Sequence, residues 1–94
     1  SGRFTDKVMR AYGTMLYATL VDSAELAKLY ASVRLGASLG MIEGLNPSTL
    51  DKMLIHGMSG VLMSENEGVR TPAERDRARA DMIRRVLTGA GTGA

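Results

Sequence analysis

Four helix-start signals divide this chain of 94 residues, and no segment between them alternates apolar and polar residues as a β-strand does. The clearest signal is the run Thr-Pro-Ala-Glu at 71–74, which combines a capping box with proline at the first helical position. Asn-Pro at 46–47 is a second such signal, and Thr5 and Asp22 are the expected N-caps of the first two helices. The sequence therefore predicts an all-α fold, a compact bundle of about four helices with short connections.

Helical spacing of apolar residues predicts which side chains face the core. Leu35 and Leu39 fall opposite the main apolar stripe of the second helix, so we expect that helix to be buried on two sides, centrally or against a second copy of the chain. Gly36 and Gly40 would permit such a close approach. The expected inward residues are Val8, Ala11, Tyr12, Met15 and Leu16, then Leu26, Leu29, Tyr30, Val33 and Ala37, then Leu50, Met53 and Leu54.

Glycines suggest where the helices end. Gly44 is the expected stop of the second helix, and the third is expected to be short, ending near His56. An irregular connection should follow over 57–70, with one apolar turn at 61–63. The last helix is expected from Pro72 to about Thr88, stopped by Gly89.

The predicted organisation is a single helical domain over residues 3–88. Residues 89–94 are expected to form a flexible tail, because they consist of small residues that have no capacity to pack. Ser1 and Gly2 resemble the remnant of a cleaved tag.

Several function classes are excluded by composition. The chain has no cysteine and one histidine, His56, so thiolate zinc sites, His-based metal clusters, cysteine catalysis and Ser–His–Asp triads cannot be assembled. His56 is expected to be a local polar or capping residue. The absence of cysteine suits a reducing cytoplasm, and no apolar run approaches the roughly 18 residues that span a bilayer, so we expect no membrane partner.

Positive charge is concentrated at the end of the chain. Residues 1–69 hold six basic and seven acidic side chains, whereas residues 70–94 hold six arginines and three acids. Helical spacing assigns the other charged residues of the last helix to an ordinary solvated face: Glu74, Arg77, Asp81, Arg84 and Arg85. A nucleic-acid partner is not expected, because acidic residues are mixed with arginines on this face and few aromatic residues are available for stacking.

Three charged residues of the last helix point the same way as its apolar residues. On a helical wheel Arg75, Asp76 and Arg79 share an arc with Met82, Ile83, Val86 and Leu87. Charges facing a core need partners. One interpretation is internal: Asp76 pairs with Arg79 while Arg75 extends to solvent or docks on a helix C-terminus.

The other interpretation is a ligand pocket. Two guanidinium groups would bind a dianion, a carboxylate beside them would bind a cation, and the small Ala80 would leave room. Arg34, near the apolar stripe of the second helix, is a weaker candidate for supporting this pocket.

The run Arg-Asp-Arg-Ala-Arg-Ala at 75–80 matches the R-D-x-x-R-A motif of the C-terminal domain of the bacterial protein-arginine kinases, the McsB branch of the ATP:guanido phosphotransferase family. Residues 10–44 and 71–87 also resemble that domain. Ser32 and Ser38 depart from the acidic residues expected there.

The resemblance implies a phosphoarginine-binding pocket, separate from the kinase active site, that stimulates the enzyme. Carried over by position, Arg75 and Arg79 would bind the phosphoryl oxygens, Asp76 would bind the guanidinium, and Ala80 would admit the ligand. The implied partners are phosphoarginine or an arginine-phosphorylated protein, the Clp-family unfoldase ClpC, and a second copy of the chain. The alternative is a dimerisation or adaptor module that docks on a Clp unfoldase, with the charged motif purely structural.

The resemblance also implies that ATP and Mg²⁺ belong to a separate catalytic domain of the kinase. The residues of such a domain are not in this sequence. We therefore expect this chain to hold no cofactor and to transfer no phosphoryl group by itself.

Overall fold

The computed structural model describes residues 2–64 and 66–92, and in these residues all regular structure is helical. The four α-helices are α1 (Gly2–Val21), α2 (Ala24–Ser38), α3 (Pro47–Leu62) and α4 (Pro72–Thr92), and a short 3₁₀ helix, η1, spans Glu67–Val69. The radius of gyration is 13.6 Å, close to the value of about 13 Å expected for a compact domain of this size. The predicted all-α bundle is confirmed.

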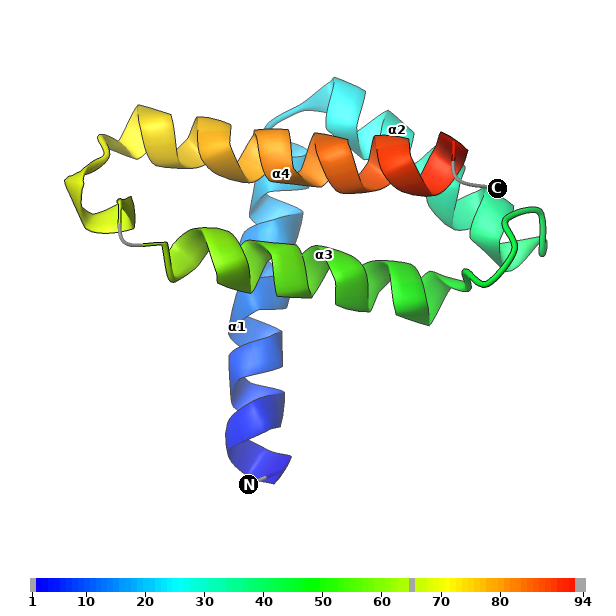
Figure 1. The fold of residues 1–94 in the computed structure, drawn as a ribbon, viewed down its shortest axis with the longest axis horizontal. Helices are drawn as coiled ribbons and strands as arrows, with labels where there is room; N and C mark the ends of the chain where they lie inside the picture. The colour runs from blue at the N-terminus through cyan, green and yellow to red at the C-terminus, as the bar shows by residue number, and fades with distance from the viewer. Residues whose placement is uncertain (1, 65, 93–94) are drawn as a thin grey trace.

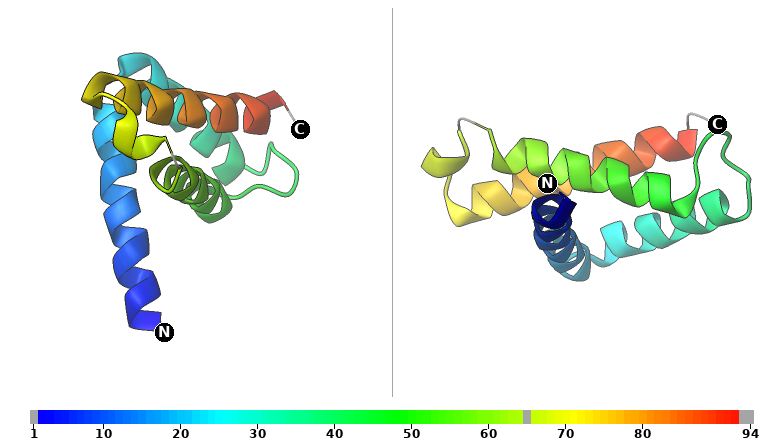
Figure 2. Two further views of the ribbon diagram at one scale, coloured as in Figure 1. Left: turned by 60° about the vertical axis from the view of Figure 1, so that its left-hand side comes forward. Right: turned by 90° about the horizontal axis from the view of Figure 1, so that it is seen from below.

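The bundle is built on an antiparallel pair of helices, α3 and α4, which lie side by side and are joined at one end by the connection that contains η1 (Figure 1). Helix α1 crosses this pair steeply, and its N-terminal part extends beyond the other helices in Figure 1 and in the left view of Figure 2. Helix α2 packs against α3 and α4. The last helix thus contacts each of the other three.

All four helices contribute to one apolar core. Most of the predicted inward residues lie there, including Leu16, Leu26 and Val33. Four do not: Met53 and Met15 are 41% and 39% exposed, Ala11 is also exposed, and Val8 is half-buried but lies outside the core cluster. The buried core residues are Leu16, Leu20, Leu26, Val33, Ala37, Leu50, Leu54, Met58, Met82, Ile83 and Leu87.

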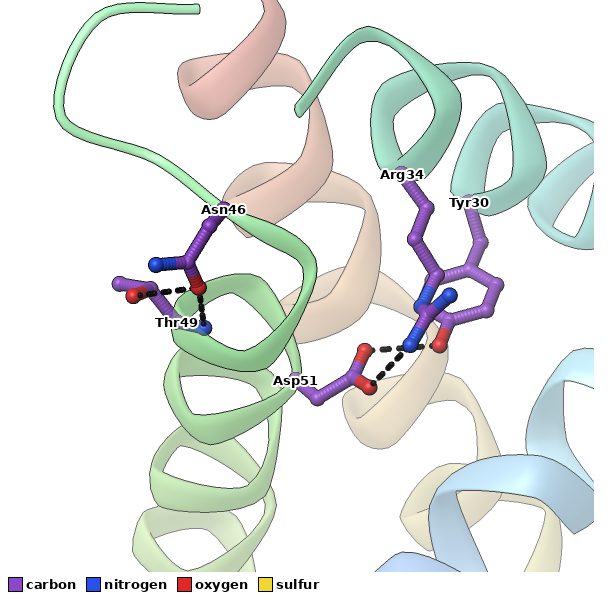
Figure 3. A network of polar contacts seen from close by, with 5 residues as sticks. All are labelled: Tyr30, Arg34, Asn46, Thr49 and Asp51. Atoms are coloured by element: carbon purple, nitrogen blue, oxygen red, sulfur yellow. Dashed lines mark hydrogen bonds and ion pairs between the residues drawn. The ribbon is translucent and has the colours of Figure 1, made fainter. Parts of the chain in front are cut away.

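Two of the four predicted N-caps are confirmed. The Asn46 side chain accepts a hydrogen bond from the backbone N–H of Thr49 at 2.8 Å, with Pro47 beginning the helix (Figure 3). Thr71 caps α4, as described below. The prediction that Asp22 caps α2 is wrong. The N-cap is Ser23, whose hydroxyl accepts a hydrogen bond from the backbone N–H of Leu26 at 3.2 Å. Thr5 is not a cap either, since α1 begins at Gly2.

Helix α2 ends earlier than predicted. Its last helical residue is Ser38, and Gly40 follows with φ +71° while the N–H of Met41 bonds the carbonyl of Gly36 at 2.9 Å. This is a Schellman ending, which requires the left-handed conformation that glycine adopts most easily. Gly40 therefore ends the helix, and the expected stop at Gly44 is wrong.

The second helix is not buried on two sides within this chain. Leu35 and Leu39 are 59% and 64% exposed, and Met41 just beyond them is 71% exposed. Three exposed apolar side chains therefore lie at or just beyond the C-terminal end of α2.

Helices α3 and α4 are both longer than predicted because glycine does not stop them. Gly57 and Gly60 lie inside α3, so the expected irregular connection over 57–70 shortens to the segment after Leu62. Helix α4 continues through Gly89 and Gly91 to Thr92, where a flexible tail was expected. The end of α4 lies close to α2, since a Cβ at residue 91 would lie 3.7 Å from Cγ2 of Val33, whereas a Cβ at residue 89 would meet nothing within 4 Å. Residues 93–94 lie outside the described residues, as does Ser1.

Gly57 lies where α3 packs closely against Met82 of α4. A Cβ at this residue would overlap the sulfur of Met82 and lie 3.1 Å from its Cγ, whereas a Cβ at Gly60 would meet nothing within 4 Å. Met82 is only 5% exposed, and an added Cβ at Gly57 would force its side chain to shift. The two glycines of α3 therefore have different roles.

We predict opposite effects for two identical substitutions in α3. Gly60→Ala should stabilise the fold by up to about 1 kcal/mol, because alanine is the better helix former and the site is open. Gly57→Ala should be less stable than Gly60→Ala by about 1–3 kcal/mol, because its methyl group overpacks the contact with Met82. Urea unfolding of both variants measures the difference, and equal unfolding midpoints would contradict the close contact.

Candidate functional site

The first turn of α4 holds the charged motif in place. The backbone N–H of Thr71 donates to the carboxylate of Glu74 at 2.8 Å, and the N–H of Glu74 donates to the hydroxyl of Thr71 at 3.2 Å. This is the predicted capping box. The hydrogen bond from the Thr71 backbone lowers the pKa of Glu74. The helix start is thereby fixed immediately before Arg75 and Asp76.

The motif side chains are engaged within the chain. Nη2 of Arg79 lies 2.7 Å from Oδ1 of Asp76, and Nη1 of Arg75 donates to the backbone carbonyl of Arg70 at 2.8 Å. The side chain of Arg79 is 15% exposed, whereas that of Asp76 is 73% exposed. The internal interpretation of the motif therefore describes these two contacts correctly. The Asp76 carboxylate nevertheless remains open to solvent on its other side.

A hollow lies beside Asp76, between α4 and the junction of α1 with α2. It encloses about 300 Å³. Asp76 and Ala80 line it together, as the pocket interpretation requires, whereas Arg75 and Arg79 are not among its lining residues. The lining residues are Thr19, Asp22, Ser23, Asp76, Arg77 and Ala80.

Arg34 lies far from the motif, in a polar network at the other end of the bundle. Its Nη2 is 3.2 Å from Oδ2 of Asp51 on α3, and the hydroxyl of Tyr30 donates to Oδ1 of the same carboxylate at 2.7 Å (Figure 3). Burial, and then the hydrogen bond to Asp51, raise the pKa of Tyr30, and the contact with Asp51 also raises the pKa of Arg34. The network joins α2 to α3.

The distance between Arg34 and the motif can be estimated along the axis of α4. Val33, its neighbour, packs near Gly91, and a rise of 1.5 Å per residue places position 91 about 22 Å from position 76 along the helix axis. The structure brings Asp76, Arg79 and Ala80 together, and it does not bring Arg34 to them.

A larger hollow on the other side of α4 was not predicted. It encloses about 520 Å³ between α4 and the C-terminal end of α3. Arg85 and Asp81, which helical spacing assigned to an ordinary solvated face, line this hollow together with Arg70. The signal available in the sequence was the spacing of 78, 81, 82 and 85, which places these positions on one face of a helix. The lining residues are Gly57, Gly60, Val61, Ser64, Arg70, Ala78, Asp81, Met82 and Arg85.

Arg84, also assigned to the solvated face, joins helices. Its Nε lies 2.9 Å from Oε1 of Glu25 on α2, and its Nη1 lies 3.1 Å from Oδ1 of Asp81. These contacts raise the pKa of Arg84, with the hydrogen bond to Glu25 as the largest cause. Arg84 thus fixes α4 to α2 just beyond the motif.

Neither a metal centre nor a membrane span is found in the part of the chain that the structure describes. Its His, Asp and Glu side chains form no group of three or more placed to hold a metal ion. None of its helices is both long and apolar enough to cross a bilayer. His56 is exposed on α3.

Comparison with known proteins identifies similar sequences along nearly the whole chain. The sequence model of the family described as "Protein-arginine kinase McsB C-terminal domain" matches residues 1–93. Curated proteins named protein-arginine kinase match over 82 residues, or 87% of this chain. They include those of Bacillus velezensis and Bacillus subtilis, each 39% identical, and that of Brevibacillus brevis, 38% identical. No solved structure matches.

The matched segment is 23% of the length of each of these relatives. The chain therefore spans about a quarter of the curated proteins it resembles.

We predict that the capping box makes a pH-dependent contribution to stability. Because the pKa of Glu74 is lowered in the folded chain, its contribution is complete above its ordinary value of 4.5 and is lost as the pH falls through the lowered pKa. Glu74→Gln should remove this part of the pH dependence. Urea unfolding between pH 3 and pH 7 measures it, with Glu43→Gln, another exposed acid, as the control. Identical pH profiles for wild type and Glu74→Gln would contradict the cap.

Proposed function

This chain belongs to the family of C-terminal domains of the protein-arginine kinases, and from that premise we propose that it is a phosphoarginine-binding regulatory domain of such an enzyme. One observation carries the proposal. The exposed carboxylate of Asp76 lies 2.7 Å from the guanidinium of Arg79, at the edge of a hollow that Ala80 helps to line. The carboxylate can bind the guanidinium of a ligand, and the guanidinium of Arg79 can bind a phosphoryl group of the same ligand. Phosphoarginine contains both groups.

Binding in this proposal is an exchange of partners. The guanidinium nitrogens of phosphoarginine replace Arg79 at the Asp76 carboxylate, and Arg79 turns its donors to the phosphoryl oxygens. Arg75, which lies one turn earlier and now donates to the carbonyl of Arg70, supplies a second guanidinium. The Asp76–Arg79 pair is already assembled in the unliganded chain, so the exchange requires only side-chain movements. Most of Asp76 is exposed, which makes it accessible to the ligand.

Weak to moderate affinity follows from the number of contacts. Three charge-assisted hydrogen bonds at about 1.5–3 kcal/mol each, set against an association cost of at least about 4 kcal/mol, correspond to a Kd between roughly millimolar and micromolar. Such an affinity suits a sensor that responds to accumulating phosphoarginine.

The rest of the proposal concerns the whole kinase. A catalytic domain outside this sequence would use ATP and Mg²⁺ to phosphorylate protein arginines, and binding of phosphoarginine to this domain would stimulate it allosterically. The phosphorylated proteins would pass to the Clp-family unfoldase ClpC for degradation, in the cytoplasm and as part of a stress response. By itself this chain would bind no cofactor and transfer no phosphoryl group, which an assay with ATP and a protein substrate would check.

A second candidate function is a dimerisation or adaptor module that docks on a Clp unfoldase. The observation that favours it is the exposed apolar surface of Leu35, Leu39 and Met41 at the end of α2. In that case the Asp76–Arg79 pair would be purely structural. Self-association in analytical ultracentrifugation would then persist in Asp76→Asn, and phosphoarginine would not bind.

We predict that free phosphoarginine binds the 94-residue chain and raises its melting temperature. At a ligand concentration of 100 times Kd the stabilisation should be about 2.7 kcal/mol. Asp76→Asn should weaken binding at least about tenfold, because a charged hydrogen-bond acceptor is lost. Isothermal calorimetry measures the affinity, and thermal unfolding measures the stabilisation.

Three controls separate the proposal from nonspecific charge effects. Free arginine and inorganic phosphate should each bind far more weakly than phosphoarginine. Arg10→Gln, which removes a charge from α1, should bind like wild type. Asp76 is 73% exposed, so Asp76→Asn should keep the fold. Equal affinity of wild type and Asp76→Asn would overturn the assignment of the site.

A further inference from the structure

The hollow beside Asp76 has a second wall that the motif does not supply. Thr19, Asp22 and Ser23 line it from the junction of α1 with α2, together with the residues of α4. These residues lie far from the motif in the sequence and meet it only in the folded chain. A ligand held by the motif in this hollow would therefore also contact the junction.

The junction is held in place before any ligand binds. The backbone N–H of Asp22 donates to the carbonyl of Ala18 at 3.2 Å, and Ser23 caps α2. Arg84 of α4 pairs with Glu25, in the first turn of α2, at 2.9 Å. The position of this wall relative to α4 is thereby fixed from both sides.

Asp22 is the residue of the junction whose side chain is available to a ligand. The hydroxyl of Thr19 donates to the carbonyl of Met15 at 3.0 Å, and the hydroxyl of Ser23 accepts from the N–H of Leu26 at 3.2 Å. Asp22 is exposed, and its carboxylate forms no hydrogen bond or ion pair with another residue that the structure describes. Its acceptor sites are therefore open.

The charges of this hollow favour a cation. Asp22, Asp76 and Arg77 line it, and two carboxylates with one guanidinium give a net charge of −1. Arg77 also attracts the carboxylate of Glu74, three residues earlier on the same helix. Arg79, which pairs with Asp76 at 2.7 Å, is not among the lining residues. If Arg79 turns to a phosphoryl group, both carboxylates can face a guanidinium inside the hollow.

A guanidinium that enters this hollow needs more than one carboxylate. It is planar and carries N–H donors on several edges, whereas one carboxylate accepts from one edge. A donor that leaves water without finding an acceptor costs free energy. The volume of about 300 Å³ is at the lower end of the range of about 300–1,000 Å³ typical of ligand sites, so it suits the end of a single side chain.

From these observations we propose that Asp22 is a specificity-determining residue, which binds the guanidinium of phosphoarginine together with Asp76. This inference rests on the proposed function of the hollow and adds a second segment of the chain to it. With one carboxylate on α4 and another at the junction of α1 with α2, the site requires a cation attached to the phosphoryl group. Phosphoserine and phosphothreonine lack that cation, so they are excluded as ligands.

The test is an NMR titration of the ¹⁵N-labelled 94-residue chain with free phosphoarginine. In the wild type the backbone amides of Asp22 and Ser23 should shift and saturate together with that of Asp76. Asp22→Asn should weaken binding about tenfold, because a charge-assisted hydrogen bond is lost. Phosphoarginine carries a net negative charge, so removal of an acid that it does not contact would strengthen its binding instead. The sign of the change therefore separates a direct contact from a general charge effect.

Two further variants serve as controls. Asp6→Asn removes the same charge from another exposed position, on α1, and should not weaken binding. Asp22→Glu keeps the carboxylate and should bind more tightly than Asp22→Asn. Circular dichroism checks that each variant is folded, which is expected because Ser23 rather than Asp22 caps α2. If Asp22→Asn does not fold, the shifts at residues 22 and 23 of the wild type decide the question.

The outcomes distinguish this inference from the function on which it rests. No binding of phosphoarginine to the wild type would refute the proposed function, and the role of Asp22 with it. Binding that Asp76→Asn weakens, but that Asp22→Asn leaves unchanged or strengthens, would overturn the role of Asp22 alone. Equal weakening by Asp6→Asn and Asp22→Asn, or the absence of shifts at residues 22 and 23, would also overturn it.

Discussion

The close packing of α3 against α4 is the constraint on which the rest of the structure depends. At Gly57 the absence of a Cβ lets the sulfur of Met82 reach the backbone of α3. Both helices also contribute fully buried residues to the same apolar core: Leu54 and Met58 from α3, and Ile83 and Leu87 from α4. Apolar burial of this kind supplies most of the free energy of folding. It also sets the rotation of α4 about its own axis.

Because of this rotation, two different sides of α4 each line a hollow. Toward α1 and α2 it presents Asp76 and Ala80 to the smaller hollow, and toward the end of α3 it presents Asp81 and Arg85 to the larger one. The ion pairs on these sides are partly exposed, and exposed pairs contribute little to stability. The fold therefore does not depend on keeping the Asp76–Arg79 pair intact. The same side chains are available for a ligand at small cost to the core.

Local interactions were predictable, and the reason is their short range. The caps at Asn46 and Thr71 join residues three positions apart, so the residue types alone indicate the hydrogen bonds. The glycines were misread as helix ends. Gly57 accommodates Met82 inside α3, and α4 continues through Gly89, the expected stop, where an added Cβ would meet nothing within 4 Å. At Gly40 a positive φ ends α2, whereas the sequence suggested only close packing there and placed the helix end at Gly44.

For the site, helical periodicity together with a recognisable motif located Arg75, Asp76, Arg79 and Ala80 on one stretch of α4. Charge and spacing along a single helix are properties of consecutive residues, which is why they can be read without coordinates. The larger hollow could not be found in this way, because Arg70 and Gly60 meet Arg85 only after α3 and α4 have packed. An arginine on α4 can be a solvated surface residue or part of the wall of a hollow, depending on where the neighbouring helix packs. The sequence of α4 alone does not determine the position of that helix.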